Sequence, residues 1–436
     1  MRKMEFTDCD GNVDEKKKGS VDQKHTDAYH DGILGALTEL ANGNAVRIRD
    51  GRNQTELKFR KESLNPVEGC GLSYVCLVLE LFREENLLTA APDKLGKCVA
   101  KLKEFDEQVH TRFPPTTRGG KPQKSPEIAS YEAAKDVIGK LFDYEKFGAG
   151  QGVKFHKSDQ SAAYIEWKHL SDWSAWHYIR ELDVDACAYC NAEAVFALCV
   201  SQKVPGKDTT FAEALADGDS DDGDRKIVQC DEMHKRSPLD HFYGYEKYPC
   251  LGLSLYNLVP ACTRCNTNMK GAKEQNAKQH VHPYRESFDD GMHFRAVFED
   301  YASLMLSKDN PNVTLVLKEK DCTDEGLPTR AKASADFFHL EEVYNQTYKH
   351  EVVDVIRRII GFPNSYWEDL RERYPGINEL VLNRMLVGCS LDRKKINRER
   401  FSKMTCDLYD QLRVSTDNIM LEAALRRANG AGFGMG

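Results

Sequence analysis

The sequence lacks a long apolar run, and it lacks an excess of positive charge. Its most apolar stretch, residues 74–82, is short and carries Glu80, whereas a helix that crosses a bilayer needs roughly 18 apolar residues. The N-terminal residues contain no apolar segment of the secretory kind, so we expect a cytoplasmic protein without a membrane partner. The formal charge of −8 argues against a basic coat for binding nucleic acid. A phosphate-binding G-x-x-x-x-G-K-(S/T) motif is also missing, so we expect no ATP hydrolysis by this chain.

The chain has 436 residues, of which 41% are hydrophobic, enough for two or three folded domains. Apolar residues at helical spacing begin near Asp31. We read residues 1–31 as a flexible arm and the breaker-rich segment 113–126 as a candidate linker. Further helices are predicted over residues 72–88, 93–113, 127–141, 165–182, 335–360, 367–373, 377–387 and 396–414, with a loop over residues 145–160.

Four of the 14 cysteines form two C-x-x-C pairs, Cys187 with Cys190 and Cys262 with Cys265. Two such turns supply four thiolates, which suits tetrahedral Zn²⁺. A site closed by four sulfur ligands is structural rather than catalytic. A single C-x-x-C pair is also typical of a redox dithiol, but two pairs favour zinc.

Polar residues of catalytic type lie between and just after these pairs. Asp240 and His241 are adjacent, Asn257 follows 16 residues after His241, and Asn266 comes directly after Cys265. The pieces that matter together are Cys187-Ala-Tyr-Cys190-Asn191, Asp240-His241-Phe242-Tyr243, Tyr248-Pro249, Leu253-Ser-Leu-Tyr-Asn257, Cys262-x-x-Cys265-Asn266 and Lys270-Gly271. This set resembles the HNH (ββα-metal) nucleases over residues 167–284, and most of all the HNH subunits of Septu-type and retron-linked anti-phage defence systems.

The resemblance implies a β-hairpin that carries Asp-His and Asn, followed by a helix that carries a final Asn or His. It assigns His241 as the general base, which suits a side chain with a pKa near neutrality. Asp240 and Asn266 would supply oxygen ligands to a catalytic Mg²⁺ or Mn²⁺, which acts as a Lewis acid. Asn257 would hold the active loop and orient His241, while the four cysteines would bind structural Zn²⁺.

One residue departs from the family pattern, and three further polar residues need an interpretation of their own. Lys270 lies four residues after Asn266, where the family pattern has a lysine three residues after that position. His282 is interpreted as a packing or surface histidine, with a third metal or phosphate ligand as the alternative. Glu232 and His234 are interpreted as structural or close to the substrate.

The fold class that we expect is α+β, with a zinc-stapled ββα-metal core flanked by mainly α-helical N- and C-terminal regions. The expected parts are a flexible arm (1–31), a helical N-terminal region (32–125), a helical lead-in (126–186), the HNH nuclease domain (187–290) with an acidic insertion (203–225), a helical C-terminal region (310–427) and a disordered tail (428–436).

The expected function is metal-dependent hydrolysis of DNA. RNA such as tRNA is the alternative substrate, and an inactive zinc-stabilised interaction module is the alternative class. Because residues 230–290 are locally neutral, basic surface for a polyanion would come from residues 393–403 or 47–61, unless both are ordinary solvated faces. The weak basic character indicates delivery by a partner. The resemblance implies an ATPase subunit of a defence complex, and a homo-oligomer is also compatible with the sequence.

Overall fold

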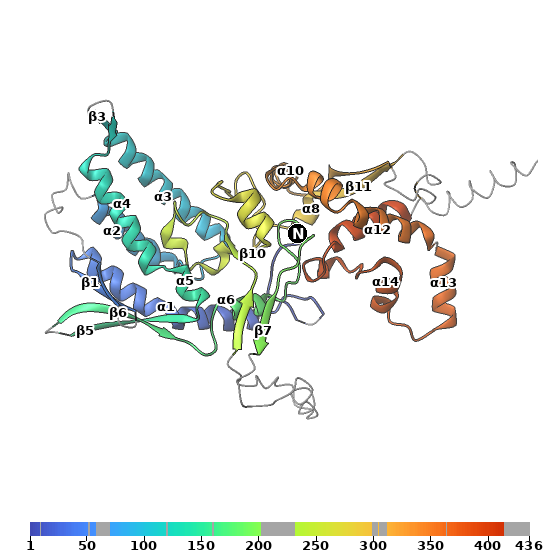
Figure 1. The fold of residues 1–436 in the computed structure, drawn as a ribbon, viewed down its shortest axis with the longest axis horizontal. Helices are drawn as coiled ribbons and strands as arrows, with labels where there is room; N and C mark the ends of the chain where they lie inside the picture. Colours follow the sequence, from blue (N-terminus) through green and yellow to red (C-terminus); the bar gives the residue numbers. More distant parts are fainter. Residues whose placement is uncertain are drawn as a thin grey trace, which may run out of the picture.

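The computed structural model describes residues 1–8, 10–50, 53–57, 70–118, 121–158, 161–201, 232–298, 304, 312–362 and 364–413. Within them the chain has an α+β fold in which helices predominate and the sheets are small. Figure 1 shows α2, α3 and α4 at one end, α12 to α14 at the other, and β10 between the two groups. The predicted acidic insertion and the C-terminal tail lie outside the described residues.

One long helix and a four-stranded sheet form the N-terminal layer. The helix is α1 (Glu15–Ala41), and the strands are β1 (Val46–Asp50), β2 (Asn53–Leu57), β5 (Gln151–Ser158) and β6 (Ser161–His169). The strand order is β2-β1-β6-β5; β1 runs parallel to β6 and the other pairs are antiparallel. A Cβ atom at Gly32 of α1 would lie 2.6 Å from a methyl carbon of Val153, so glycine lets α1 pack closely on β5.

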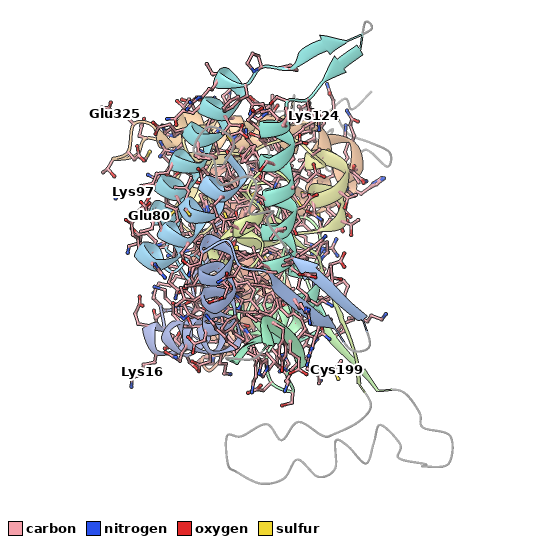
Figure 2. The ribbon with its side chains drawn as sticks, turned by 90° about the vertical axis from the view of Figure 1, so that its left-hand side faces the viewer. Lys16, Glu80, Lys97, Lys124, Cys199 and Glu325 are labelled. Carbon is pink, nitrogen blue, oxygen red and sulfur yellow. The ribbon has the colours of Figure 1, made fainter. Side chains whose placement is uncertain are left out.

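Three helices stand beside this layer and reach towards the centre of the molecule. They are α2 (Cys70–Glu85), α3 (Pro92–Arg112) and α4 (Pro126–Leu141), with the hairpin β3 (Thr116–Arg118) and β4 (Lys121–Gln123) between α3 and α4. Both α2 and α3 pack against α4, so helices on either side of residues 113–126 share one core. Figure 2 shows Glu80 of α2 and Lys97 of α3 on the outer surface of this group.

The central part contains two short strand pairs, two short α-helices and a π-helix. Its elements are α5 (Tyr144–Gly148), α6 (Ala175–Leu182), β7 (Ala197–Ser201), β8 (Glu232–Arg236), β9 (Leu239–His241), β10 (Leu258–Pro260) and the π-helix η4 (Arg264–Lys270). β9 and β10 are antiparallel, with His241 opposite Leu258 and Asp240 opposite Val259. A strand, a second strand and a helix therefore follow one another, and the loop 242–257 joins the strands.

The C-terminal part is a hairpin covered by helices. It comprises α8 (Phe288–Gly291), β11 (Met292–Phe298), β12 (Val313–Glu319), α10 (Leu327–Phe337), α11 (Leu340–Glu342), the π-helix η5 (Val343–Thr347), α12 (Lys349–Gly361), α13 (Asn364–Arg373), α14 (Glu379–Val387), the 3₁₀ helix η6 (Arg393–Arg398) and a helix over residues 402–413. These elements agree with the predicted helical regions beyond residue 335, although the first region (335–360) and the last (396–414) are interrupted.

Two expectations for the N-terminal half are wrong. Residues 1–31 are not a flexible arm where they are described, because α1 already begins at Glu15 and Met1, Met4 and Phe6 are buried. The Met1 ammonium donates to Asn397 Oδ1 at 2.7 Å, which joins the start of the chain to its C-terminal part.

The other error concerns residues 145–182. The predicted loop over 145–160 contains α5 and β5, and the predicted helix over 165–182 is β6 followed by α6. In β6 the side chains alternate, with Ala163, Ile165 and Trp167 buried, which is the period of a strand with one covered face.

Candidate functional site

The four cysteines of the two C-x-x-C pairs meet in one buried cluster. Their Sγ atoms all lie within 4.8 Å of one another, and Cys190 Sγ is 3.9 Å from Cys262 Sγ. Four sulfurs at about 2.3 Å from a tetrahedral zinc are about 3.8 Å apart, so the cluster has the dimensions of such a site. The backbone N–H of Cys262 donates to Cys187 Sγ, and that of Cys265 donates to Cys262 Sγ. Four buried cysteines could therefore hold a metal ion, as the spacing predicted.

Asp240 is a buried carboxylate in the middle of β9. Lys270 Nζ donates to both of its oxygens, at 2.9 and 2.7 Å, and Tyr189 Oη donates to Oδ2 at 2.6 Å. The side chains of Asp240 and Lys270 are only 5% and 4% exposed. Lys270 Nζ also donates to the main-chain oxygen of His241. The lysine at the end of η4 thus ties the helix to β9.

This ion pair bears on the predicted role of Asp240 as a metal ligand. A carboxylate and an amide oxygen are suitable donors for Mg²⁺ or Mn²⁺, and the Asn266 side chain is half-buried on η4. Both Asp240 oxygens, however, already accept hydrogen bonds from the Lys270 ammonium. A divalent cation at Asp240 would therefore have to displace Lys270.

His241 is half-buried at the end of β9, and its ring is fixed by the loop 242–257. Its Nε2 lies 3.1 Å from the main-chain oxygen of Gly252. Because that oxygen can only accept, Nε2 carries the proton and Nδ1 carries the lone pair. Burial lowers the pKa of His241 below its ordinary value. The Tyr144 ring stands edge-on to the imidazole, with centroids 4.9 Å apart.

Asn257 closes the loop 242–257 from the inside. It is fully buried; its Oδ1 accepts from the N–H of Tyr243 at 2.7 Å, and its Nδ2 donates to the oxygens of Tyr243 and Leu251. Leu251 directly precedes Gly252, the partner of His241. Asn257 therefore fixes the main chain at Tyr243 and at Leu251, the residue next to Gly252, whose oxygen orients the imidazole.

The N-terminal helices hold the same loop from the outside. His25 Nε2 of α1 donates to the oxygen of Leu253 at 2.7 Å, and Tyr178 Oη of α6 donates to that of Leu255 at 2.8 Å. Ser254 Oγ donates to the oxygen of Leu87, which follows α2. The loop beside His241 is therefore packed against residues that precede residue 187 in the sequence.

A pocket of about 560 Å³ brings together three of the four residues predicted for the catalytic centre. Asp240, His241 and Asn266 line it, whereas Asn257 lies behind it within the loop. The charged groups that complete its wall are Asp143, Glu145, Glu246, Lys247, Lys270, Lys273 and Glu274. The pocket thus contains charges of both signs around the predicted base.

Sequence reasoning missed the contacts of Lys270 and the roles of Tyr144 and Tyr189. Asn266 and Lys270 are four residues apart, so a helix after the second cysteine pair places both on one face. That spacing was the available signal for Lys270. Tyr189 stands between the first two cysteines, and no pattern in the sequence links it to Asp240.

The remaining candidate histidines lie apart from the pocket. His282 is completely buried, and its ring packs on Phe242 with centroids 4.2 Å apart. Its interpretation as a packing residue agrees with this position. Glu232 and His234 belong to β8, opposite Ser201 and Cys199 of β7.

The basic run 393–403 is open to solvent only in part. Arg393 bonds to Asp289, Asp407 and Asp410, and Lys403 is completely buried against Asp407. Arg393 and Lys403 are therefore used inside the C-terminal part, whereas Lys394 and Arg400 of the same run are exposed, and the run stays a candidate surface for nucleic acid.

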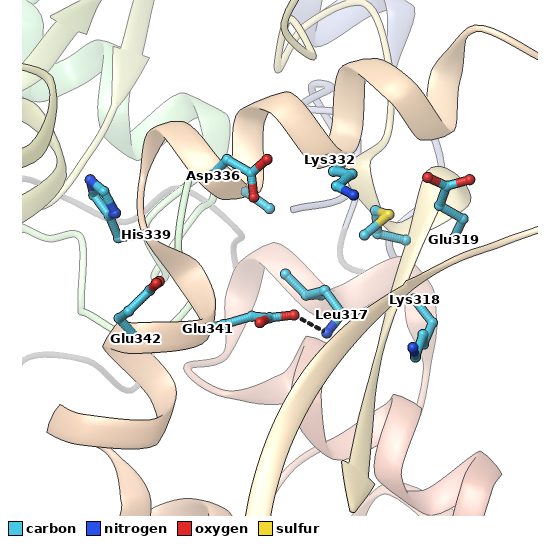
Figure 3. Close-up of a pocket in the computed structure, with 10 residues that line it drawn as sticks. Leu317, Lys318, Glu319, Lys332, Asp336, His339, Glu341 and Glu342 are labelled. Atoms are coloured by element: carbon cyan, nitrogen blue, oxygen red, sulfur yellow. Dashed lines mark hydrogen bonds between the residues drawn. The ribbon is translucent and has the colours of Figure 1, made fainter.

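A separate pocket of about 670 Å³ lies between β12 and α10. Figure 3 shows Lys318 and Glu319 on one side and Lys332, Asp336 and His339 on the other. The backbone N–H of Leu317 donates a hydrogen bond to Glu341 Oε1 at 2.6 Å. Among the described residues, the four cysteines are the only group of three or more His, Cys, Asp or Glu side chains that could hold a metal ion, and this pocket contains no such group.

Among the described residues, every helix is too short or too polar to span a bilayer. Comparison with models of protein families, with curated proteins and with solved structures found no match to this chain.

Proposed function

We propose that this chain is a metal-dependent HNH (ββα-metal) endonuclease that hydrolyses phosphodiester bonds in DNA. The observation that carries the proposal is the pocket in which Asp240, His241 and Asn266 meet. These residues lie on a strand–strand–helix unit in the order that the resemblance requires. The adjacent cysteine cluster would bind a structural zinc ion that fixes η4 to the strand pair.

His241 is the proposed general base. Its Nε2 proton is held by Gly252, so Nδ1 is available to accept a proton from the attacking water. The lowered pKa keeps the imidazole unprotonated near neutral pH. Asn257 acts as a positioning residue, because it fixes Leu251 and Tyr243 around the segment that holds the imidazole.

Asp240 and Asn266 would hold Mg²⁺ or Mn²⁺ once Lys270 moves away from Asp240. Such an ion supplies Lewis acidity towards a phosphate oxygen. Lys273 in the pocket wall adds positive charge next to a bound phosphate, whereas Lys247 is paired with Glu274 at 2.9 Å.

We further propose that the chain acts with an ATPase subunit in an anti-phage defence complex, as the resemblance implies. The internal ion pairs of Arg393 and Lys403 in the basic run 393–403 support this dependence. With fewer free cations the chain contacts fewer phosphates, and its affinity for a polyanion falls accordingly.

The test is cleavage of plasmid DNA and of total RNA in Mg²⁺ or Mn²⁺, with and without the ATPase subunit. His241→Ala should lower the DNA cleavage rate by about 10²–10⁴-fold, the usual effect of losing a general base, and leave the zinc content unchanged. His169→Ala, which alters an exposed histidine at the end of β6, is the matched control. Cleavage of RNA alone would make RNA the substrate. An inert wild-type complex would instead indicate a zinc-stabilised interaction module.

A further inference from the structure

The four-stranded sheet β2-β1-β6-β5 has one covered face and one open face. Val46, Ile165 and Trp167 point inward and are buried. Among the described helices, α1 and α5 make the main contacts with this sheet. Both lie on the inner side, because Phe147 of α5 packs against Tyr29 of α1. In the described part of the chain, the main helical contacts therefore leave the other face of the sheet uncovered, so a partner molecule can reach its side chains.

The open face is basic in an acidic protein. Its exposed cations are Arg47, Arg49, Lys154 and Lys168, and its acidic groups are Glu56 and Glu166. The strand register places them on one face, because Arg47 lies opposite Glu56, and both Arg49 and Lys154 lie opposite Glu166. Four cations against two carboxylates leave a local charge of +2, whereas the whole chain carries −8. Among the described residues, Arg47, Arg49 and Lys154 form no ion pair, whereas Lys168 pairs with Glu166 at 3.1 Å on the surface.

Planar side chains form a row across the middle of this face. The Arg49 guanidinium lies over the Tyr164 ring, 3.8 Å from its centroid. On β5, the His156 ring stacks with Tyr164, with centroids 4.6 Å apart and an interplanar angle of 14°. The row ends at Arg49, which is exposed, and at His156, which is half-buried with its Nε2 3.4 Å from Glu166 Oε2. Nucleobases stack on guanidinium and aromatic planes of this kind.

We propose that this open face binds a single strand of nucleic acid. The four cations would contact phosphates, and unpaired bases would stack at the ends of the row Arg49–Tyr164–His156. A single strand offers phosphates and unstacked bases together, whereas a duplex keeps its bases paired and leaves the planar row unused. The inference goes beyond the proposed function because it concerns binding on a surface that shares no residue with the pocket around His241.

The test is fluorescence anisotropy of a labelled 20-nucleotide single strand with the full-length His241→Ala protein. This variant lacks the proposed general base, so the anisotropy reports binding without cleavage of the strand. The sheet variant adds Arg47→Gln, Arg49→Gln, Lys154→Gln and Lys168→Gln. We expect its Kd to rise at least tenfold. If all four cations contact phosphates, the slope of log K against log salt concentration should fall by about 3, at about 0.7 per phosphate for single strands. Arg49→Lys keeps the charge but removes the plane, so it should weaken binding about fivefold or more with an unchanged slope.

The matched control removes four exposed lysines from α3, which is not part of the sheet: Lys94, Lys97, Lys101 and Lys103, each changed to Gln. It has the same net charge as the sheet variant and should bind nearly as the parent does. Equal losses in both variants would overturn the proposal, because binding would then follow net charge alone. Tighter binding of a duplex of the same sequence, or of vesicles with anionic lipids, would also overturn it. Binding without cleavage in the wild type would leave this inference standing while the nuclease proposal fails.

Discussion

Lys270 and Asp240 form a buried ion pair whose partners come from different elements, η4 and β9. Burial lowers the pKa of Lys270, and Asp240 opposes that shift. Removing one member of a buried pair leaves the other charge without a partner in a medium of low polarity, which costs about 3–5 kcal/mol. In this protein the unpaired charge would be the carboxylate that the proposed function assigns to a divalent cation.

Lys270→Met should therefore have two opposite effects. Without a divalent cation, the free energy of unfolding should fall by about 3–5 kcal/mol because Asp240 loses its counter-charge. With Mn²⁺, the variant should bind the ion at least tenfold more tightly than the wild type, because no ammonium competes for the carboxylate. Urea unfolding and calorimetric titration with Mn²⁺ measure the two effects.

The control for this experiment is Lys273→Met. Lys273 also lines the pocket, but it makes no ion pair with Asp240, so neither quantity should change much. If Lys270→Met left the Mn²⁺ affinity unchanged, Asp240 would not be a ligand of the ion.

At the scale of elements, the loop 242–257 owes its conformation to residues from distant parts of the chain. His25 is the clearest case: its Nε2 donates to Leu253, and its Nδ1 accepts from Trp173 Nε1 at 3.1 Å. Both ring nitrogens are satisfied in the neutral form, and a second proton would remove the acceptor that Trp173 uses. Burial lowers the pKa of His25 to about 3.

This shift predicts a dependence of stability on pH. The unfolded chain binds a proton to His25 near pH 6.5, while the folded chain does so only near pH 3. The contribution is therefore fully present above pH 6.5 and is lost as the pH falls towards 3, by about 2 kcal/mol at pH 5. In His25→Gln, the difference in unfolding free energy between pH 7 and pH 5 should shrink by about that amount.

His282, whose pKa burial also lowers to about 3, should supply a similar loss that His25→Gln leaves in place. His110→Gln, an exposed position on α3, should leave the whole difference unchanged. An unaltered pH dependence in His25→Gln would mean that folding does not hold His25 neutral.

The elements also show what the sequence could and could not predict. The cysteine cluster was predicted because C-x-x-C spacing is a local property. Strand β6 was missed because Trp167, Trp173 and Trp176 fit a helical spacing, although the alternation from Ala163 to Trp167 was the signal for a strand. The contacts that hold the loop 242–257 could not be predicted, because His25 and Leu253 are 228 residues apart and no sequence pattern links them.

At the scale of the whole molecule, the cysteine cluster connects the central part to the C-terminal helices. Tyr344 Oη of η5 donates to the oxygen of Cys190 at 2.9 Å. Asn191, directly after that cysteine, donates through Nδ2 to the oxygen of Ile396. The turn around Cys190 therefore holds η5 and η6 in place, so the state of the cluster should affect more than the strand pair.

Loss of the proposed zinc ion should accordingly destabilise both the central and the C-terminal parts. A ligand that binds only the folded state at a thousand times its Kd stabilises it by about 4 kcal/mol, so chelation should lower the unfolding free energy by at least that amount. Cys262→Ser should reproduce this loss and reduce the zinc content measured by mass spectrometry. Cys98→Ser changes a buried thiol of α3 outside the cluster and should retain the metal.

In hydrogen exchange, Cys262→Ser should increase the exchange of η4 together with that of η5 and η6, because Tyr344 and Asn191 couple them to Cys190. Exchange confined to residues 258–270 would show instead that the cluster stabilises only the strand pair and its helix.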